Sequence, residues 1–254
     1  MTNWSPDSFP RGGGQITLSL DGDRATLLLD QPARKNAISP GMMRDLRDAV
    51  KVLEAQMGIS SLLLTGAGDA FCTGGDLSAV REHLMAPEAG AGMCAMMTDV
   101  TDRLSALPVV IVAAVEGHAI GGGAELLTVA DVVIAARSAR IGFIHARLGV
   151  SPGWGGGRRL VERIGARDAL KAMAFARTLS AEAAQSLGLV DELVEDGEAR
   201  AHAAGLQHRL SSLPVQAVRA AVAIARGQPE GPLFARLWGG PAHLHALSTV
   251  NAGR

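Results

Sequence analysis

Apolar and polar residues alternate near the start of the chain, and unbroken apolar runs replace this alternation further along. Residues 15–20 and 24–29 alternate on either side of Asp21-Gly22-Asp23, a pattern that predicts a β-hairpin. The stretches 61–65, 109–115 and 131–136 are largely apolar, as expected of buried strands. Residues 40–53 instead place apolar side chains at helical spacing. Strand, turn and helix recur in this order, so the pattern predicts an α/β fold built from a repeated unit.

Two glycine-rich turns each lie between a predicted strand and a predicted helix. The first is Phe-Cys-Thr-Gly-Gly-Asp-Leu at 71–77, and the second is Gly-His-Ala-Ile-Gly-Gly-Gly-Ala-Glu-Leu at 117–126. Glycine lets the main chain approach a ligand closely, and the N–H groups that open a helix point outward at its positive end. Two such turns side by side would offer two N–H donors to one oxygen, such as a thioester oxyanion. Close helix–strand packing without a ligand is the alternative that glycine-rich turns alone leave open.

These two turns resemble the oxyanion-hole segments of the crotonase (enoyl-CoA hydratase/isomerase) superfamily. Asn36-Ala37-Ile38 resembles a third segment of that family and residues 149–156 a fourth, and the similarity runs from about residue 16 to residue 188. The resemblance implies a crotonase-like spiral of ββα repeats over residues 1–197, which carries an acyl-CoA site. It further implies a helical C-terminal region, 198–254, that packs in a homotrimer or in a hexamer made of two trimers.

The resemblance also assigns roles to individual residues. Gly75 and Gly122 would supply the two oxyanion N–H groups, and Glu125 would move protons. The residues expected to contact the acyl-CoA substrate are Arg34, Lys35, Ala37, Thr73, Gly74, Asp76, Leu77, Gly121 and Trp154. For Arg34 and Lys35 the family pattern favours the CoA phosphates as partners, whereas the residue types alone are equally consistent with simple solvation.

A histidine stands where hydratases of this family carry the second of two catalytic carboxylates. Hydratases of this family hold a water between two carboxylates, of which Glu125 matches the first. His145 occupies the place of the second. An imidazole can donate to a carboxylate or deliver a proton, whereas two carboxylates would repel an anionic substrate group. The residue therefore puts hydration in doubt, although a purely structural histidine is the alternative.

Two further stretches resemble the ethylmalonyl-CoA decarboxylase branch of the superfamily, namely residues 143–156 and Trp-Gly-Gly-Pro-Ala-His-Leu at 238–244. That resemblance implies a carboxy-lyase that decarboxylates ethylmalonyl-CoA or methylmalonyl-CoA through an enolate held in the oxyanion hole. Either Glu125 or His145 would then protonate Cα. Two other functions stay open: an enoyl-CoA hydratase or isomerase that uses Glu125, and a non-catalytic subunit that binds acyl-CoA.

Composition narrows the remaining possibilities. The 254 residues carry a formal net charge of −1 with no basic stripe, which argues against nucleic acid or an anionic membrane surface as partner. No apolar stretch approaches the ~20 residues of a membrane helix. Cys72 and Cys94 have no metal-ligand spacing, so we expect no metal site and a reduced, cytoplasmic protein. We expect no cofactor, since coenzyme A would be part of the substrate.

Overall fold

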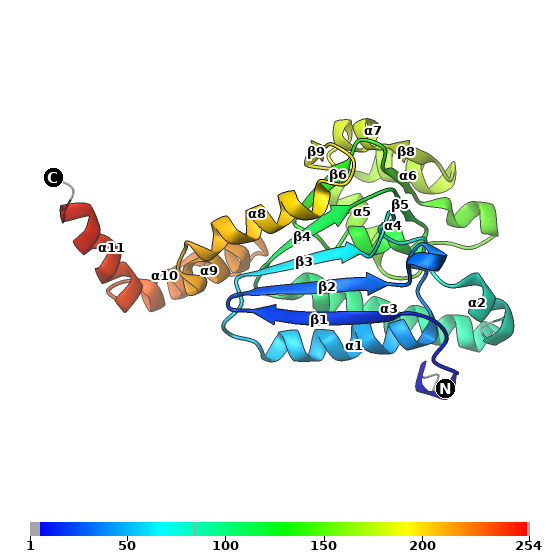
Figure 1. The fold of residues 1–254 in the computed structure, drawn as a ribbon, viewed down its shortest axis with the longest axis horizontal. Coiled ribbons are helices and arrows are strands. Elements are labelled where there is room, and N and C mark those ends of the chain that lie inside the picture. Colours follow the sequence, from blue (N-terminus) through cyan, green and yellow to red (C-terminus); the bar gives the residue numbers. More distant parts are fainter. Residues whose placement is uncertain (1–5, 84, 253–254) are drawn as a thin grey trace.

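A six-stranded sheet forms the centre of the computed structural model, which describes residues 6–83 and 85–252 (Figure 1). Its strands, in spatial order, are β1 (Gln15–Asp21), β2 (Arg24–Asp30), β3 (Ser61–Gly66), β4 (Val110–Val115), β6 (Val132–Ala136) and β9 (Glu192–Val194). β1 and β2 pair antiparallel, and every later neighbour pairs in parallel. The predicted hairpin and the three predicted buried strands are therefore confirmed.

A second, smaller sheet lies beside the carboxyl ends of the central strands. It consists of β5 (His118–Ile120), β7 (Arg140–Gly142) and β8 (Thr178–Ser180), in that order. The chain passes from β4 to β5 and on to α4 (Gly122–Leu127), and then from β6 to β7 and on to the 3-10 helix η3 (Ile144–Leu148). Each passage uses one strand from each sheet before a helix, which confirms the predicted ββα repeat.

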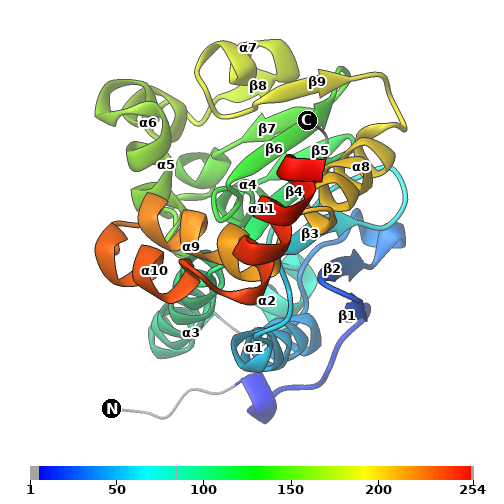
Figure 2. The ribbon, with the colours of Figure 1, turned by 90° about the vertical axis from the view of Figure 1, so that its left-hand side faces the viewer.

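Both faces of the central sheet are covered by helices. Leu62, Ile111 and Val133 belong to the main core, which also includes residues of α1 (Pro40–Ala55) and α3 (Pro87–Ala106). On the opposite face, Leu63 and Val112 join a second cluster with residues of α8 (Ala199–Ser211) (Figure 2). Burial on both faces explains why the strands read as continuous apolar runs.

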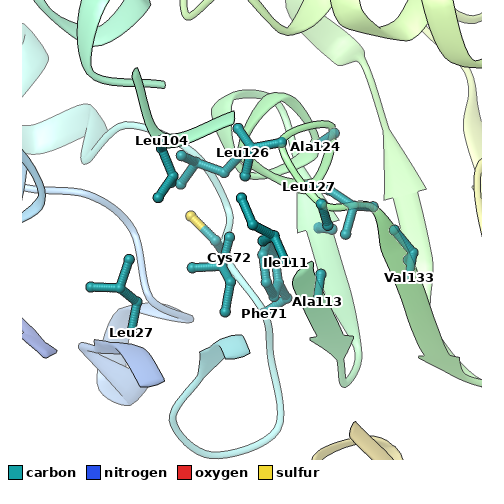
Figure 3. Close-up of a cluster of buried hydrophobic side chains, with 14 of the residues drawn as sticks. Leu27, Phe71, Cys72, Leu104, Ile111, Ala113, Ala124, Leu126, Leu127 and Val133 are labelled. Carbon is teal, nitrogen blue, oxygen red and sulfur yellow. The ribbon is translucent and has the colours of Figure 1, made fainter. Parts of the chain in front are cut away.

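The main core reaches the glycine-rich turns. Phe71 and Cys72, which follow β3, are fully buried beside Ile111 of β4 and Leu126 of α4 (Figure 3). These buried side chains hold both glycine-rich turns in place, because a closely packed interior resists displacement of its side chains.

Two helices begin at serine residues whose side chains cap the first turn. The Oγ atoms of Ser39 and Ser180 each accept a hydrogen bond from the main-chain N–H three residues on, at 3.2 Å in both cases. Ser39 opens α1 and Ser180 opens α7 (Ala181–Ser186). The remaining helical segments are η1 (Pro6–Ser8), η2 (Pro32–Arg34), α2 (Leu77–His83), α5 (Gly156–Ile164), α6 (Ala166–Ala174), α9 (Val215–Ala225), α10 (Glu230–Leu237) and α11 (Pro241–Ala252).

The C-terminal helices divide into two groups. α8 packs on β3, β4 and β6, and α9 contacts β4, whereas α10 and α11 extend beyond the ends of β1 and β2 (Figure 1). Large apolar side chains on these last two helices and in the turn between them are exposed: Phe234, Trp238, Leu244 and Leu247. Within the described residues, no helix is both long enough and apolar enough to cross a membrane.

Candidate active site

Main-chain hydrogen bonds bring the two predicted glycine-rich turns together. Cys72 lies in a parallel bridge with Ala119, in which its N–H donates to the carbonyl of His118 and its carbonyl accepts from Ile120, both at 2.9 Å. A second parallel bridge joins Ile38 to the same turn, through the carbonyl of Gly74 at 2.7 Å and the N–H of Asp76 at 2.9 Å. Three segments far apart in the sequence therefore meet at this point.

The N–H groups of Gly75 and Gly122 are the two candidate oxyanion donors. In the bridge to Ile38, the bonds are made by the neighbours of Gly75, so its own N–H points the other way. Gly122 is the first residue of α4, where an N–H has no partner within the helix. Within the described part of the chain neither N–H has an acceptor, so both are available to a ligand.

Gly74 shows how closely the two turns approach. Its φ is +89°, which favours glycine, and a Cβ there would lie 2.9 Å from the main-chain nitrogen of Gly122. Any side chain would thus crowd the second oxyanion donor. Gly121 has a φ of +57° and donates its N–H to the carbonyl of Gly142 at 2.7 Å, which ties the start of α4 to the small sheet.

The carboxylate of Glu125 is buried and surrounded by donors. Oε1 accepts from the N–H of Gly153 at 3.1 Å, and Oε2 accepts from the N–H groups of Trp154 at 2.8 Å and Gly156 at 3.0 Å. A Cβ on Gly156 would lie within 2.7 Å of Glu125, so glycine is what allows this approach. Glu125 therefore fastens the 153–156 loop to α4, a role that sequence reasoning missed.

His145 lies in η3 and faces Glu125, as the sequence pattern places it. Its Nε2 is 3.0 Å from Oε1 of Glu125, and its side chain is buried. Its Nδ1 is also buried and has no hydrogen-bond partner among the described residues. One nitrogen of the ring is thus held by Glu125, and the other is buried without a hydrogen-bond partner among the described residues.

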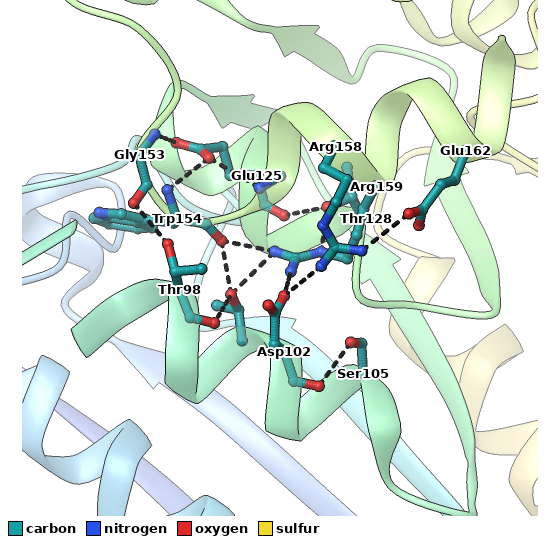
Figure 4. A network of polar contacts seen from close by, with 12 residues as sticks. Thr98, Asp102, Ser105, Glu125, Thr128, Gly153, Trp154, Arg158, Arg159 and Glu162 are labelled. Atoms are coloured by element: carbon teal, nitrogen blue, oxygen red, sulfur yellow. Dashed lines mark hydrogen bonds and ion pairs between the residues drawn. The ribbon is translucent and has the colours of Figure 1, made fainter. Parts of the chain in front are cut away.

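A polar network behind Glu125 was not predicted (Figure 4). The buried guanidinium of Arg159 donates to Oδ1 of Asp102 at 2.5 Å and to Oγ1 of Thr128 at 3.1 Å. Its Nη2 donates to Oγ1 of Thr101 at 3.0 Å and to the carbonyl of Trp154 at 2.7 Å. Burial lowers the pKa of Arg159, while the nearby Asp102 opposes that shift. The network links α3, α4 and α5 around the loop that Glu125 holds.

The residues expected at coenzyme A lie in two adjacent segments. Arg34 donates to both oxygens of Asp76, at 2.8 and 3.0 Å, and to Oγ of Ser78 at 2.8 Å. The N–H of Thr73 donates to the carbonyl of Lys35 at 3.1 Å, which joins the segments through the main chain. Of the other expected residues, Ala37 is buried, while Lys35 and Leu77 are exposed. Arg34 is therefore engaged with Asp76, and Lys35 is the more available cation.

The fold and the site together define the class of protein. The family model for enoyl-CoA hydratase/isomerase matches residues 25–236. The chain belongs to this family.

Individual proteins of known name are similar to the chain over most of its length. The chain is 37% identical over 260 residues to an ethylmalonyl-CoA decarboxylase from Danio rerio, covering 95% of this chain and 85% of that protein. It is 36% identical to the Homo sapiens ethylmalonyl-CoA decarboxylase, covering 94% of this chain and 82% of that protein. Among solved structures, a putative enoyl-CoA hydratase from Streptomyces coelicolor A3(2) superposes with a TM-score of 0.87 at 27% identity, over 94% of this chain and 92% of the other.

Proposed function

We propose that this protein is an acyl-CoA decarboxylase that removes CO2 from a malonyl-type thioester, ethylmalonyl-CoA or methylmalonyl-CoA. The observation that carries the proposal is the pairing of His145 with Glu125, where a hydratase of this family would hold two carboxylates. A histidine–glutamate pair does not repel an anionic substrate group as two carboxylates would. The names of the relatives, ethylmalonyl-CoA decarboxylases from fish to human, support the same reaction.

The reaction begins with the substrate carbonyl on the N–H groups of Gly75 and Gly122. The bond from Cα to the carboxylate lies perpendicular to the thioester plane, so that it overlaps the carbonyl π system as it breaks. CO2 leaves without the bonding electron pair, which becomes the enolate, and the negative charge falls on the thioester oxygen. Each N–H that meets this oxygen at hydrogen-bond distance stabilises the enolate, and a single such donor is worth ~3–4 kcal/mol in other enzymes.

His145 then protonates Cα in this proposal. Glu125 already accepts three main-chain N–H groups, which suits it to hold the loop and to orient the imidazole. Nε2 of His145 lies on Glu125 and Nδ1 has no partner, so the doubly protonated ring would keep its Nε2–H on Glu125 and give its Nδ1 proton to Cα, which leaves the ring neutral. The sequence left open the choice between Glu125 and His145, and we propose His145 as the proton donor.

The remaining parts of the proposal concern the assembly and the rest of the substrate. Lys35, with Arg34 beside it, would meet the CoA phosphates, and the reaction calls for no metal, biotin or nicotinamide. The exposed apolar side chains of α10 and α11 support a homotrimer or a hexamer of two trimers, which analytical ultracentrifugation would test against a monomer. Both cysteines are free thiols, which suits a cytoplasmic protein.

Product analysis in D2O tests the reaction. Ethylmalonyl-CoA should lose CO2 and give butyryl-CoA that carries one deuterium at Cα. The alternative, hydration or isomerisation of an enoyl-CoA, is favoured by Glu125 and by the structural similarity to proteins named enoyl-CoA hydratases. It would leave ethylmalonyl-CoA intact and add water to crotonyl-CoA or move its double bond, and either result would refute the proposal.

A further inference from the structure

The main chain of Trp154 is held by hydrogen bonds with residues of three helices, α3, α4 and α5. Its N–H donates to Glu125 on α4 at 2.8 Å. Its carbonyl accepts from Oγ1 of Thr101 on α3 and from Nη2 of Arg159 on α5, both at 2.7 Å. The residue as a whole is 4% exposed, and Figure 4 shows its indole pointing away from Arg159. The position of the ring is therefore set by the protein itself.

The indole lies against Gly122 and leaves room only for a Cβ between itself and Gly75. A Cβ built on Gly122 would lie within 2.7 Å of three ring carbons, Cζ3, Cη2 and Cε3. A Cβ on Gly75 would lie 3.9 Å from Cζ2 of the same ring. The ring thus fills the space beside Gly122 and extends toward Gly75, although the two glycines belong to separate turns.

We infer that Trp154 is a positioning residue, a wedge that holds the Gly75 and Gly122 turns at the separation their N–H groups need to share one oxygen. An oxyanion hole stabilises charge only when its donors are fixed in advance at hydrogen-bond distance. Loss of the ring leaves a cavity against Gly122, into which the turns relax. A displacement of about 1 Å in such a site can reduce the rate ~10²-fold.

Arg159 helps to hold Trp154 in this position. Its Nη2 bonds both the carbonyl of Trp154 and the hydroxyl of Thr101, which itself donates to that carbonyl. Thr128 joins the group, since it accepts from Arg159 and donates to the carbonyl of Glu125 at 2.6 Å. The network that sequence reasoning missed is therefore the support of the wedge.

The inference rests on the proposed oxyanion hole, and its test uses a thioester that is not turned over. Butyryl-CoA labelled with 13C at the carbonyl is bound to the protein, and the infrared difference spectrum records how far the C=O stretch is lowered. We expect a clear lowering in the wild type, most of which is lost in Trp154→Ala and partly restored in Trp154→Phe. Binding of the thioester should weaken far less than the carbonyl shift, and kcat should fall ~10²-fold with little change in KM.

Two further variants keep the test decisive. Leu46→Ala empties a buried site on α1 and should lower stability while leaving the carbonyl shift intact. Thr101→Val removes the hydroxyl that donates to the Trp154 carbonyl and accepts from Nη2 of Arg159, at nearly constant volume. It replaces Trp154→Ala in the comparison if that variant does not fold. We expect its carbonyl shift to lie between those of the wild type and Trp154→Ala.

A full carbonyl shift in folded Trp154→Ala would overturn the inference, and so would a wild type that leaves the carbonyl unperturbed. If the wild type polarises butyryl-CoA through Trp154 but leaves ethylmalonyl-CoA intact, the wedge stands and the proposed reaction fails. The two proposals therefore fail by different results.

Discussion

Substitution of His145 by glutamate should separate the two reactions that this fold can support. In the wild type, Nε2 of His145 lies 3.0 Å from Oε1 of Glu125, with both side chains buried. His145→Glu places a second protein carboxylate at this position, beside the carboxylate of the bound substrate. Two like unit charges ~4 Å apart cost ~4 kcal/mol at an effective dielectric constant of ~20, and this repulsion arises only when ethylmalonyl-CoA is bound.

That energy corresponds to a loss of about 10³ in kcat/KM for ethylmalonyl-CoA, at ~1.4 kcal/mol for each factor of ten. Proton uptake by one of the paired carboxyls would reduce this loss, because it removes one of the negative charges. His145→Gln is the matched control, because it adds no charge: it should lose kcat through the missing proton donor while KM changes little. Steady-state rates of CO2 release, together with circular dichroism to check folding, give both values.

The same variant should show weak hydration of crotonyl-CoA, because it restores the pair of carboxylates that hydratases use. Decarboxylation by His145→Glu within a factor of ten of the wild-type rate would refute the role given to His145.

Three other predictions follow from the contacts. Glu125→Gln should lower the free energy of unfolding by ~1–3 kcal/mol, because in either amide orientation a buried main-chain N–H loses its acceptor; an unchanged urea midpoint at an unchanged m-value would contradict this. Lys35→Met should raise KM for the CoA thioester several-fold at low salt and less at high salt, whereas a salt-independent KM equal to that of the wild type would exclude phosphate contact. Burial raises the pKa of the Cys72 thiol to about 12, although the N–H of Gly74 partly opposes this. Iodoacetamide at pH 8 should therefore alkylate only Cys94 in the native protein, and rapid loss of both thiols would contradict it.

The raised pKa of the Cys72 thiol also means that the free energy of unfolding should fall as pH rises into the alkaline range. Above the unfolded thiol's pKa of about 8.5, the unfolded chain releases a proton that the native protein keeps. The contribution of this group to stability is complete below that pH and falls as pH rises toward 12, by about 1.4 kcal/mol per pH unit. Cys72→Ala should lack this part of the alkaline loss.

Five strands of the large sheet could be predicted because they are five to seven residues long, enough to show a pattern. The sixth strand, β9, has three residues and was missed. β3 and β4 are six residues each and carry an almost continuous apolar signal. β5, β7 and β8 are three residues each, too short to show periodicity, and their pairing depends on the turns that precede them. The small sheet was therefore missed as separate strands, although the repeated order of elements was visible.

Some features of the site could likewise be predicted from the sequence, and others could not. Gly75, Gly122, Glu125 and His145 stand within local motifs, so the sequence could indicate them. The contact of Arg159 with Asp102 joins residues on separate helices, and nothing in the local sequence of either residue signals the other. The same is true of Arg34 and Asp76, whose ion pair changes which cation is available to a phosphate.

The ratio of two rates on one preparation of the wild type tests the central claim most directly. The measurement compares kcat/KM for CO2 release from ethylmalonyl-CoA with kcat/KM for hydration of crotonyl-CoA. The pairing of His145 with Glu125 predicts that decarboxylation dominates and that crotonyl-CoA is barely changed. Efficient hydration of crotonyl-CoA, with no CO2 released from ethylmalonyl-CoA, would contradict the account.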